Sequence, residues 1–370
     1  MPAKEATPFS LALDRRVEEG ALGALYEKLP DNQVRCYACA HRCLIKEGLR
    51  GICKVRYNRG GELMVPRGYV GALQCDPIEK KPFFHAFPGT DALTFGMLGC
   101  DLHCSYCQNW VTSQALRDPG ALTEPMDVTP RQLVDIARGQ RASVVATSYN
   151  EPLITSEWAV EVFKEARPRG FSTAYISNGN ATREVLEFIR PFTDLYKIDL
   201  KSFRDKNYRS LGGKLENIVN GVRMVHEMGF WLEIVTLIIP GFNDSDEELG
   251  EIAHFLAGLS SSIPWHVTAF HKDYKMQDPD NTTPETLLRA ARIGEAAGLQ
   301  YIYAGNLPGR VGPYEDTRCP ACKATLIRRI GYRILEDRLT GVGRCFRCGR
   351  EIPGVWKTAS ATTINAGRAN

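Results

Sequence analysis

Apolar runs of strand length alternate with helix-like segments from about residue 92 to residue 306, and this alternation constrains the fold more than any other feature. The runs are LTFGML (93–98), SVVATSY (143–149), FSTAYIS (171–177), DLYKIDL (194–200), WLEIVTLII (231–239), WHVTAF (265–270) and LQYIYAG (299–305). Helix-like segments lie near 130–138, 156–167, 182–190, 215–228, 245–257 and 284–297, with Thr155 or Ser156, Thr182, Ser245 and Thr283 as candidate caps. Repeated alternation predicts an α/β fold with one parallel sheet and crossover helices, without room for a second sheet. It fits a doubly wound sheet as well as a complete or partial barrel.

Polar residues follow the predicted strands at the end where parallel sheets carry their sites. They include Asn150, Glu151, Asn178, Asp199, Lys201 and His271. Each also has an ordinary explanation as a turn residue, a helix first-turn acid or an ion pair. Their recurrence at one end of successive strands predicts that they share a site.

Eleven of the twelve cysteines fall in three clusters, and only Cys75 stands apart, which we interpret as a small buried hydrophobic residue. The chain contains no run of eighteen apolar residues, and its N-terminus lacks the apolar region of a secretory signal. We therefore expect a cytoplasmic protein without a membrane span. Disulfides are rare in the cytoplasm, so clustered cysteines predict metal sites.

The stretch GCDLHCSYCQNW (99–110) places Cys100, Cys104 and Cys107 in a Cys-x3-Cys-x2-Cys pattern without a fourth cysteine. A structural zinc site needs four ligands, and His103 lies awkwardly inside the first spacer. A cubane iron–sulfur cluster suits three thiolates better, because each binds one iron and the fourth iron stays open. Tyr106 and Trp110 would shield such a cluster from water.

Cys319, Cys322, Cys345 and Cys348 form two Cys-x2-Cys pairs separated by twenty-two residues, the spacing of a four-cysteine zinc ribbon. Between them RRIGYRILEDRLTG (328–341) predicts two strands and a turn. The ribbon is accompanied by Arg328, Arg329, Arg344, Arg347 and Arg350. A structural staple with a solvated basic face is favoured over a platform for RNA, because the formal net charge is only +3 and aromatic residues are sparse there.

Residues 11–29 have helical periodicity interrupted by glycines, and residues 36–75 are rich in glycine and cysteine. Cys36, Cys39, Cys43 and Cys53, with His41 among them, fit either zinc or an auxiliary iron–sulfur cluster, since thiolates suit both. We favour structural zinc. The predicted organisation is a helix and Cys-rich unit (1–91), the α/β domain (92–306), the ribbon-like unit (307–356) and a frayed polar tail (357–370).

The Cys-x3-Cys-x2-Cys motif with Tyr106 before its last cysteine resembles the signature of the radical S-adenosylmethionine (radical SAM) enzymes. The Cys loop, YNEP (149–152), ISNG (176–179), KIDLKS (197–202) and PGFND (240–244) look most like the pyruvate formate-lyase activating-enzyme branch. The N-terminal CYACAHRCLIKEGLRGICKVRYN, SYNEP, YAGN and CGREIPGVW look still closer to the radical SAM component of the AmmeMemoRadiSam system.

This resemblance implies a partial (β/α)6 barrel over 92–306 and a [4Fe-4S] cluster on Cys100, Cys104 and Cys107, whose open iron binds S-adenosylmethionine. Asn150 and Glu151 would then contact the methionine amine, and Ser177 and Asn178 the methionine carboxylate or the ribose. Asp199, Lys201 and His271 are further cofactor-binding candidates. Tyr149 and Asn150 depart from the GGEP of many relatives, so Glu151 is the firmer assignment.

The resemblance implies reductive cleavage of S-adenosylmethionine to a 5′-deoxyadenosyl radical that takes hydrogen from an undetermined substrate. It also implies a low-potential electron donor and, as partners, the two other AmmeMemoRadiSam proteins. A glycyl-radical enzyme activase is an alternative within the superfamily. A zinc-ribbon protein that binds or modifies RNA is the alternative outside it, although the charge balance argues against nucleic acid.

Overall fold

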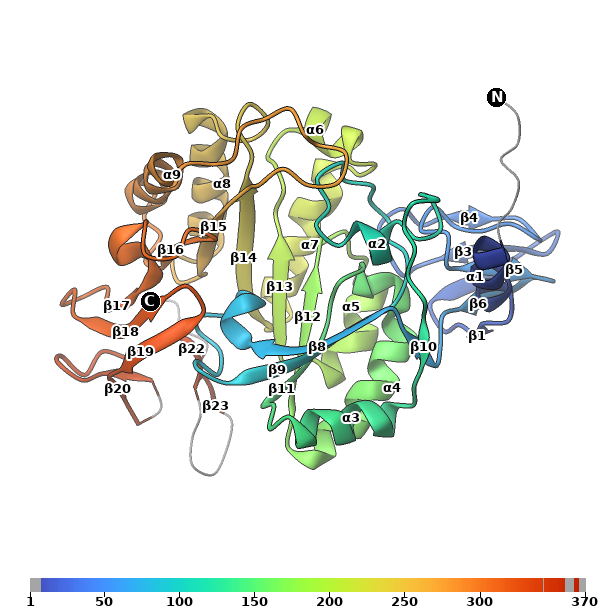
Figure 1. The fold of residues 1–370 in the computed structure, drawn as a ribbon, viewed down its shortest axis with the longest axis horizontal. Coiled ribbons are helices and arrows are strands. Elements are labelled where there is room, and N and C mark those ends of the chain that lie inside the picture. The colour runs from blue at the N-terminus through green and yellow to red at the C-terminus, as the bar shows by residue number, and fades with distance from the viewer. Residues whose placement is uncertain (1–7, 342, 357–362, 366–370) are drawn as a thin grey trace.

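The middle of the chain forms an eight-stranded sheet (Figure 1). The computed structural model describes residues 8–341, 343–356 and 363–365. The strand order of the sheet is β16-β15-β14-β13-β12-β11-β9-β8. The strands are β8 (Ala72–Pro77), β9 (Asp91–Gly96), β11 (Val144–Thr147), β12 (Ser172–Ser177), β13 (Leu195–Asp199), β14 (Trp231–Ile238), β15 (Trp265–Ala269) and β16 (Ile302–Gly305). The seven strands from β9 to β16 are parallel neighbours in chain order, and β8 is antiparallel to β9. Because the edge strands β8 and β16 do not pair, the sheet is a partial barrel.

Helices follow the strands as the alternation predicts, giving six strand–helix units and then β16 as a seventh strand. The main crossover helices are α3 (Pro130–Gly139), α4 (Ser156–Ala166), α5 (Arg183–Ile189), α7 (Leu215–Glu227), α8 (Asp246–Leu259) and α9 (Pro284–Ala296). Shorter helices are α2 (Trp110–Ser113) and α6 (Asp205–Ser210). The predicted caps Thr182, Ser245 and Thr283 each accept a backbone N–H. The side chain of Thr155 makes no capping hydrogen bond to α4. Thr129 forms a capping box with Gln132 at the start of α3, which we did not predict.

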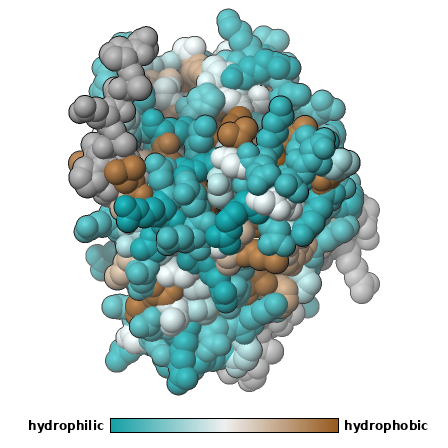
Figure 2. All heavy atoms as spheres, turned by 90° about the vertical axis from the view of Figure 1, so that its right-hand side faces the viewer, coloured by the Kyte–Doolittle hydropathy of each residue, from teal (hydrophilic) through white to brown (hydrophobic). Residues whose placement is uncertain are grey.

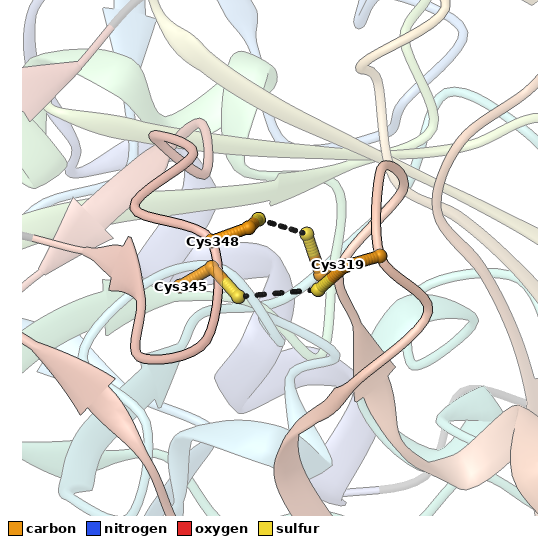
Figure 3. A group of neighbouring side chains, drawn as sticks. Cys319, Cys345 and Cys348 are labelled. Carbon is orange, nitrogen blue, oxygen red and sulfur yellow. Dashed lines mark hydrogen bonds between the residues drawn. The ribbon is translucent and has the colours of Figure 1, made fainter.

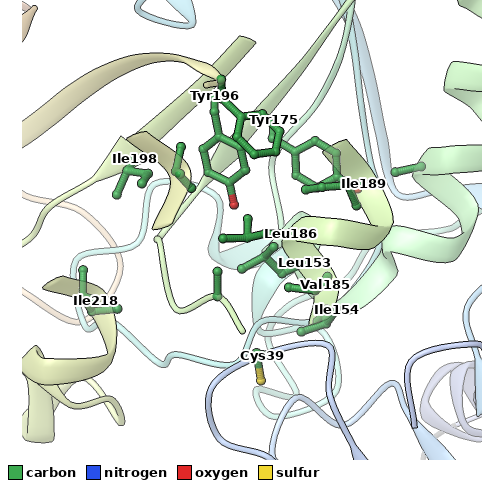
Figure 4. Packing of buried hydrophobic residues seen from close by; sticks show 14 of the residues in the cluster. Cys39, Leu153, Ile154, Tyr175, Val185, Leu186, Ile189, Tyr196, Ile198 and Ile218 are labelled. Atoms are coloured by element: carbon green, nitrogen blue, oxygen red, sulfur yellow. The ribbon is translucent and has the colours of Figure 1, made fainter. Parts of the chain in front are cut away.

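The sheet buries a different core on each face. Between sheet and helices lie residues such as Tyr175 and Tyr196, whose rings stack 5.7 Å apart, together with Leu186 and Ile198 (Figure 4). The concave face is partly filled by a second core in which Phe83 and Val355 cover small residues of the strands. Segment 78–87 and β22 (Gly354–Trp356) therefore cover the concave face beside Ala92 and Val144, near the start of the strands. The cavity described below lies at the opposite end.

The N-terminal unit is mostly β-structure, contrary to the helix expected over 11–29. Helix α1 (Pro8–Glu18) ends before Gly20, and β1 (Ala21–Leu22) and β2 (Tyr26–Leu29) follow. A Cβ at Gly20 would stand 2.5 Å from the carbonyl oxygen of Val65, so only glycine allows the chain to approach β6 this closely. The helical pattern of residues 11–29 does not indicate this tertiary contact. The remaining strands are β3 (Gln33–Cys36), β4 (Leu44–Ile45), β5 (Tyr57–Arg59), β6 (Glu62–Val65) and β7 (Tyr69–Val70), which pairs with β10 (Met126–Asp127).

Strand β8 had no counterpart in the sequence-based expectation. It lies within 1–91 but pairs with β9, so the main sheet begins before residue 92. Cys75 on β8 is only half-buried, so the expectation of a buried hydrophobic residue was wrong.

The C-terminal unit contains the predicted strand pair, β18 (Thr325–Ile330) and β19 (Arg333–Asp337), which turn at Gly331. Short strands β17 (Thr317–Arg318), β20 (Leu339–Thr340) and β21 (Arg344–Cys345) complete it. Residues 363–365 form β23 (Thr363–Asn365), which pairs with β22, so this part of the tail is not frayed. The other predicted tail residues, 357–362 and 366–370, lie outside the described residues.

The face on the N-terminal side is mostly hydrophilic, with hydrophobic atoms in small separate groups (Figure 2). Scattered apolar side chains are ordinary on a protein surface. No helix of the described chain is both long and apolar enough to cross a membrane.

Candidate functional site

The three-cysteine loop follows β9 and lines a cavity of about 370 Å³ at the carboxyl ends of the strands. Cys104 is buried, and Cys100 and Cys107 are half-buried. The backbone N–H of Leu102 donates to the Cys100 sulfur at 3.4 Å, and the Cys107 sulfur lies 3.2 Å from the Ser113 hydroxyl. Residues of one loop thus present three sulfurs to one cavity.

The spacing of these cysteines differs from that of a site for one ion. Within the described residues, their ligand atoms belong to no group of three or more lying within 4.8 Å of one another. Tetrahedral zinc with 2.3 Å bonds needs sulfurs about 3.8 Å apart. A cubane takes each thiolate on a different iron and holds them farther apart, so the loop fits a [4Fe-4S] cluster.

His103 does not complete this site. It is exposed, does not line the cavity and packs against Gly212, where an added Cβ would stand 2.3 Å from its ring. Tyr106 is buried and lines the cavity, as a shielding residue should. Trp110 does not line it and stacks on Tyr274 at 5.0 Å.

Glu151 lies buried in the cavity wall and accepts three hydrogen bonds. Its donors are the Ser177 hydroxyl at 2.8 Å and the backbone N–H groups of Asn178 at 2.7 Å and Leu153 at 3.0 Å. Burial and the neighbouring Asp101 raise the pKa of Glu151 to about 8, although the three hydrogen bonds oppose that rise. The site therefore holds a carboxyl group that a nearby cation would ionise.

Asn150 lines the cavity, but its side chain is used within the protein. Its Oδ1 accepts from the Met97 N–H at 3.0 Å and its Nδ2 donates to the Glu151 carbonyl at 3.2 Å. The preceding Tyr149 has φ +66°, a left-handed conformation that costs a bulky residue energy. Its hydroxyl lies 3.0 Å from the Lys81 amine on the cavity wall. Tyr149, a residue that we did not assign to the site, therefore holds a strained backbone at the cavity wall.

Asp199 and Lys201 both line the cavity, with Lys197, which the sequence did not single out. The Lys197 amine donates to Asp199 at 2.6 Å, and the Lys201 amine lies 3.9 Å from the same carboxylate. Burial raises the pKa of Asp199, but the two lysines lower it further, so the net shift is downward. The alternation of side chains along β13 puts Lys197 and Asp199 on one face, a signal that could have found Lys197.

His271 is the one predicted cofactor residue that does not line this cavity. It is exposed, and its Nε2 lies 2.9 Å from the side-chain nitrogen of Gln108, which does line the cavity. The structure therefore brings Asn150, Glu151, Ser177, Asn178, Asp199 and Lys201 together with the three cysteines, and leaves His271 at the rim.

Asp101, between two of the predicted ligands, is a buried residue that sequence reasoning missed. Its two carboxylate oxygens accept from the side-chain amides of Asn178 and Asn180, each at 2.7 Å. Its carbonyl oxygen lies 3.2 Å from His41 Nε2 of the N-terminal unit. Asp101 therefore joins the cysteine loop to the end of β12 and to the N-terminal segment.

The C-terminal unit supplies part of the cavity wall through Tyr332, at the turn between β18 and β19. The Tyr332 hydroxyl donates to Asn306 Oδ1 at 3.3 Å. Arg329 is buried and donates to Thr317 and to the carbonyl of Phe84. Because Arg329 attaches the unit to the barrel, it does not belong to a solvated basic face as expected.

The four C-terminal cysteines converge as the ribbon pattern predicts (Figure 3). The sulfurs of Cys319 and Cys348 are 3.6 Å apart, as are those of Cys322 and Cys345. All four ligand atoms lie within 4.8 Å of one another, a separation that suits one tetrahedral ion. The unit is therefore a metal-binding cysteine cluster.

The N-terminal cysteines do not converge in this way. Cys36, Cys39 and Cys53 are buried and Cys43 is half-buried. No three of their sulfurs lie within 4.8 Å of one another in the described chain.

Known proteins resemble this chain over much of its length. Residues 95–256 match the radical SAM superfamily. An uncharacterized protein of Methanocaldococcus jannaschii is 37% identical over 88% of this chain and 97% of its own length. The pyruvate formate-lyase-activating enzyme of Staphylococcus aureus is 25% identical over 55% of this chain and 88% of its own length.

Solved structures were also matched. A domain of the pyruvate-formate lyase-activating enzyme from Bacteroides vulgatus covers 44% of this chain and 98% of its own, with 21% identity and a TM-score of 0.39. A radical SAM methyltransferase from Sphaerobacter thermophilus covers 60% of this chain and 68% of its own, with 19% identity and a TM-score of 0.44.

Proposed function

The chain belongs to the radical SAM superfamily, and we propose that it cleaves S-adenosylmethionine reductively at the cavity formed by the cysteine loop and the strand ends. The observation that carries this proposal is the meeting of three cysteine sulfurs and the buried carboxyl of Glu151 on one cavity. A [4Fe-4S] cluster bound by Cys100, Cys104 and Cys107 would supply an open iron and the electron that converts S-adenosylmethionine to methionine and a 5′-deoxyadenosyl radical.

Glu151 has the chemistry to bind the methionine amine. It is held by Ser177 and the Asn178 backbone, so its side chain is ordered before the cofactor arrives. An ammonium group beside it would stabilise the carboxylate, which burial alone disfavours. Asn150 is proposed to lie beside Glu151 at the amine, and Ser177 and Asn178 at the methionine carboxylate or the ribose.

Asp199 and Lys201 lie on the same cavity wall and present opposite charges to it. Burial lowers the pKa of Lys201, but Asp199 and the Cys104 thiolate more than offset this effect, so the pKa is raised well above its ordinary value. A lysine that stays protonated is suited to an anionic group such as the methionine carboxylate. His271 at the rim, which touches Gln108, is proposed as an outer contact.

We further propose that the radical takes hydrogen from a substrate placed between the barrel and the C-terminal unit. Lys81, Tyr149 and Tyr332 line the cavity there. The C-terminal cysteines are proposed to hold zinc as a staple for this wall. Burial of Arg329 supports the staple over an RNA platform.

The proposed setting is the cytoplasm, with a low-potential electron donor. The resemblance of the N-terminal and C-terminal motifs supports action with the two other proteins of an AmmeMemoRadiSam-type system. A second candidate function, activation of a glycyl-radical enzyme, is favoured by the 25% identity with the pyruvate formate-lyase-activating enzyme. Electron paramagnetic resonance would separate the two, because an activase leaves a radical on its partner protein.

The test uses protein reconstituted with iron and sulfide without oxygen, reduced with dithionite and given S-adenosylmethionine. We expect 5′-deoxyadenosine from the native protein and none from Cys104→Ala. Cys75→Ala is a matched control, since Cys75 lies on β8 outside the cavity and should leave product formation intact. An equal yield from Cys104→Ala and the native protein would contradict the proposal.

A further inference from the structure

The four N-terminal cysteines lie on adjoining turns and strands and do not meet as ligands of one ion in the described chain. A Cβ at Gly51 would stand 3.7 Å from the Cys43 sulfur, so the turn that carries Cys53 lies beside Cys43. The Cys36 N–H donates to the Cys43 carbonyl at 3.0 Å, which holds β3 beside that loop. The four cysteines therefore lie on neighbouring segments, although no three of their sulfurs lie within 4.8 Å of one another in the described chain.

Tight turns direct these cysteines inward. Arg42 has φ +45° and its N–H donates to the Cys39 carbonyl, which closes a turn between Cys39 and Cys43. Lys54 has φ +68° and its N–H donates to the Gly51 carbonyl, which closes a turn around Cys53. Left-handed residues in two such turns cost conformational energy that a bound group would offset.

An unpartnered donor lies beside the same cysteines. Arg56 is buried and bonds Glu157 and the Ile154 carbonyl, but its Nε–H has no partner among the residues that the structure describes. The Arg56 carbonyl accepts from the Gly51 N–H at 2.9 Å, which places Arg56 beside the turn around Cys53. A negatively charged group held by the cysteines would stand near this guanidinium and give the free N–H an acceptor.

Spacing distinguishes the two groups that four thiolates can hold. Tetrahedral zinc holds its four sulfurs about 3.8 Å from one another. Two sulfur pairs of the C-terminal cysteines lie close to this separation, at 3.6 Å. A cubane separates its thiolates because each binds a different iron. The N-terminal set shares its wider spacing with Cys100, Cys104 and Cys107, not with the C-terminal set.

We propose that Cys36, Cys39, Cys43 and Cys53 bind a second [4Fe-4S] cluster, fully ligated by the protein. This replaces the zinc that the sequence alone favoured. The cluster would lie under the barrel core, where Cys39 points its sulfur away from Ile154 and Val185 (Figure 4). It would also be close to the cavity, because the neighbouring Ala40 N–H donates to Asn180 and His41 contacts Asp101.

The test measures metal in the full-length chain with the cavity cysteines removed, as Cys100→Ala/Cys104→Ala/Cys107→Ala. After anaerobic reconstitution we expect about four iron and four sulfide per chain. Dithionite should give a [4Fe-4S]⁺ resonance signal that S-adenosylmethionine does not alter. The same protein with Cys39→Ala and Cys53→Ala added should lose this iron and keep the zinc of the C-terminal cysteines.

Two zinc atoms and no iron in the triple variant would overturn the proposal. If that variant does not fold, the native chain decides, because two clusters give about eight iron per chain and one cluster gives about four. These readouts do not depend on cleavage of S-adenosylmethionine. A native protein that holds both clusters without forming 5′-deoxyadenosine would contradict the proposed function alone.

Discussion

The side-chain amide of Asn178 donates a 2.7 Å hydrogen bond to Asp101 Oδ1, and this contact joins the end of β12 to the cysteine loop. Asp101 holds Asn180 through its other oxygen. One buried carboxylate thus positions two segments of the cavity wall that lie about eighty residues apart in the chain.

Replacing Asp101 with alanine should loosen this junction. Two buried amides would lose their acceptor, at a cost of about 2–4 kcal/mol in the free energy of unfolding. We expect a lower urea midpoint and at least tenfold less 5′-deoxyadenosine. Asp278→Ala, at an exposed position, is the control for loss of one negative charge. Unchanged stability in Asp101→Ala would show that the contact contributes little.

Tyr149 allows a test of stored backbone strain, because its φ is +66°. Tyr149→Gly and Tyr149→Ala both lose the ring and the Lys81 contact, but only glycine adopts this conformation freely. We expect the glycine variant to be more stable than the alanine variant by roughly 1 kcal/mol in urea unfolding. Equal stabilities would mean that the segment relaxes to another conformation.

His85 should make stability depend on pH. It is buried between the Pro353 carbonyl and the Tyr303 hydroxyl, and burial lowers its pKa to about 4. The unfolded histidine ionises near 6.5, so its contribution is present above that pH and is lost as the pH falls toward 4.

The stability difference between native protein and His85→Gln should therefore shrink across this range, by about 3 kcal/mol at most. Thermal unfolding at several pH values measures it, and His254→Gln is an exposed control. A difference that does not change between pH 7 and pH 4 would contradict the assignment.

Removal of the C-terminal metal should disturb the cavity at a distance. Cys322→Ser would break the four-cysteine group, whose unit carries Tyr332 into the cavity wall. We expect loss of one zinc per chain and a lower unfolding temperature. Retention of zinc by Cys322→Ser would show that this cysteine is not a ligand.

Much of the central domain could be predicted from sequence because its signals are local. A parallel strand covered on both faces is an apolar run, and polar residues at its carboxyl end mark the site edge. Asn150, Glu151, Asn178 and Asp199 were predicted at this edge for this reason, and they line one cavity. The spacing of Cys319, Cys322, Cys345 and Cys348 likewise predicts their convergence, since short knuckles place cysteine pairs in fixed geometry.

Residues whose roles depend on distant partners were not found. Asp101 matters through Asn178 and Asn180, and Tyr332 matters because a hairpin from another unit folds against the cavity. The N-terminal helix was predicted too long because the contact of Gly20 with Val65 leaves no trace in local periodicity.

The amino-acid sequence shows which groups are available: three thiolates without a fourth, a carboxyl after β11 and a four-cysteine ribbon. The distances between the sulfurs, and the buried charges that face them, become visible in the folded chain. Ligand spacing and burial arise from packing between segments distant in the chain, and these properties separate a site for one ion from a site for a cluster.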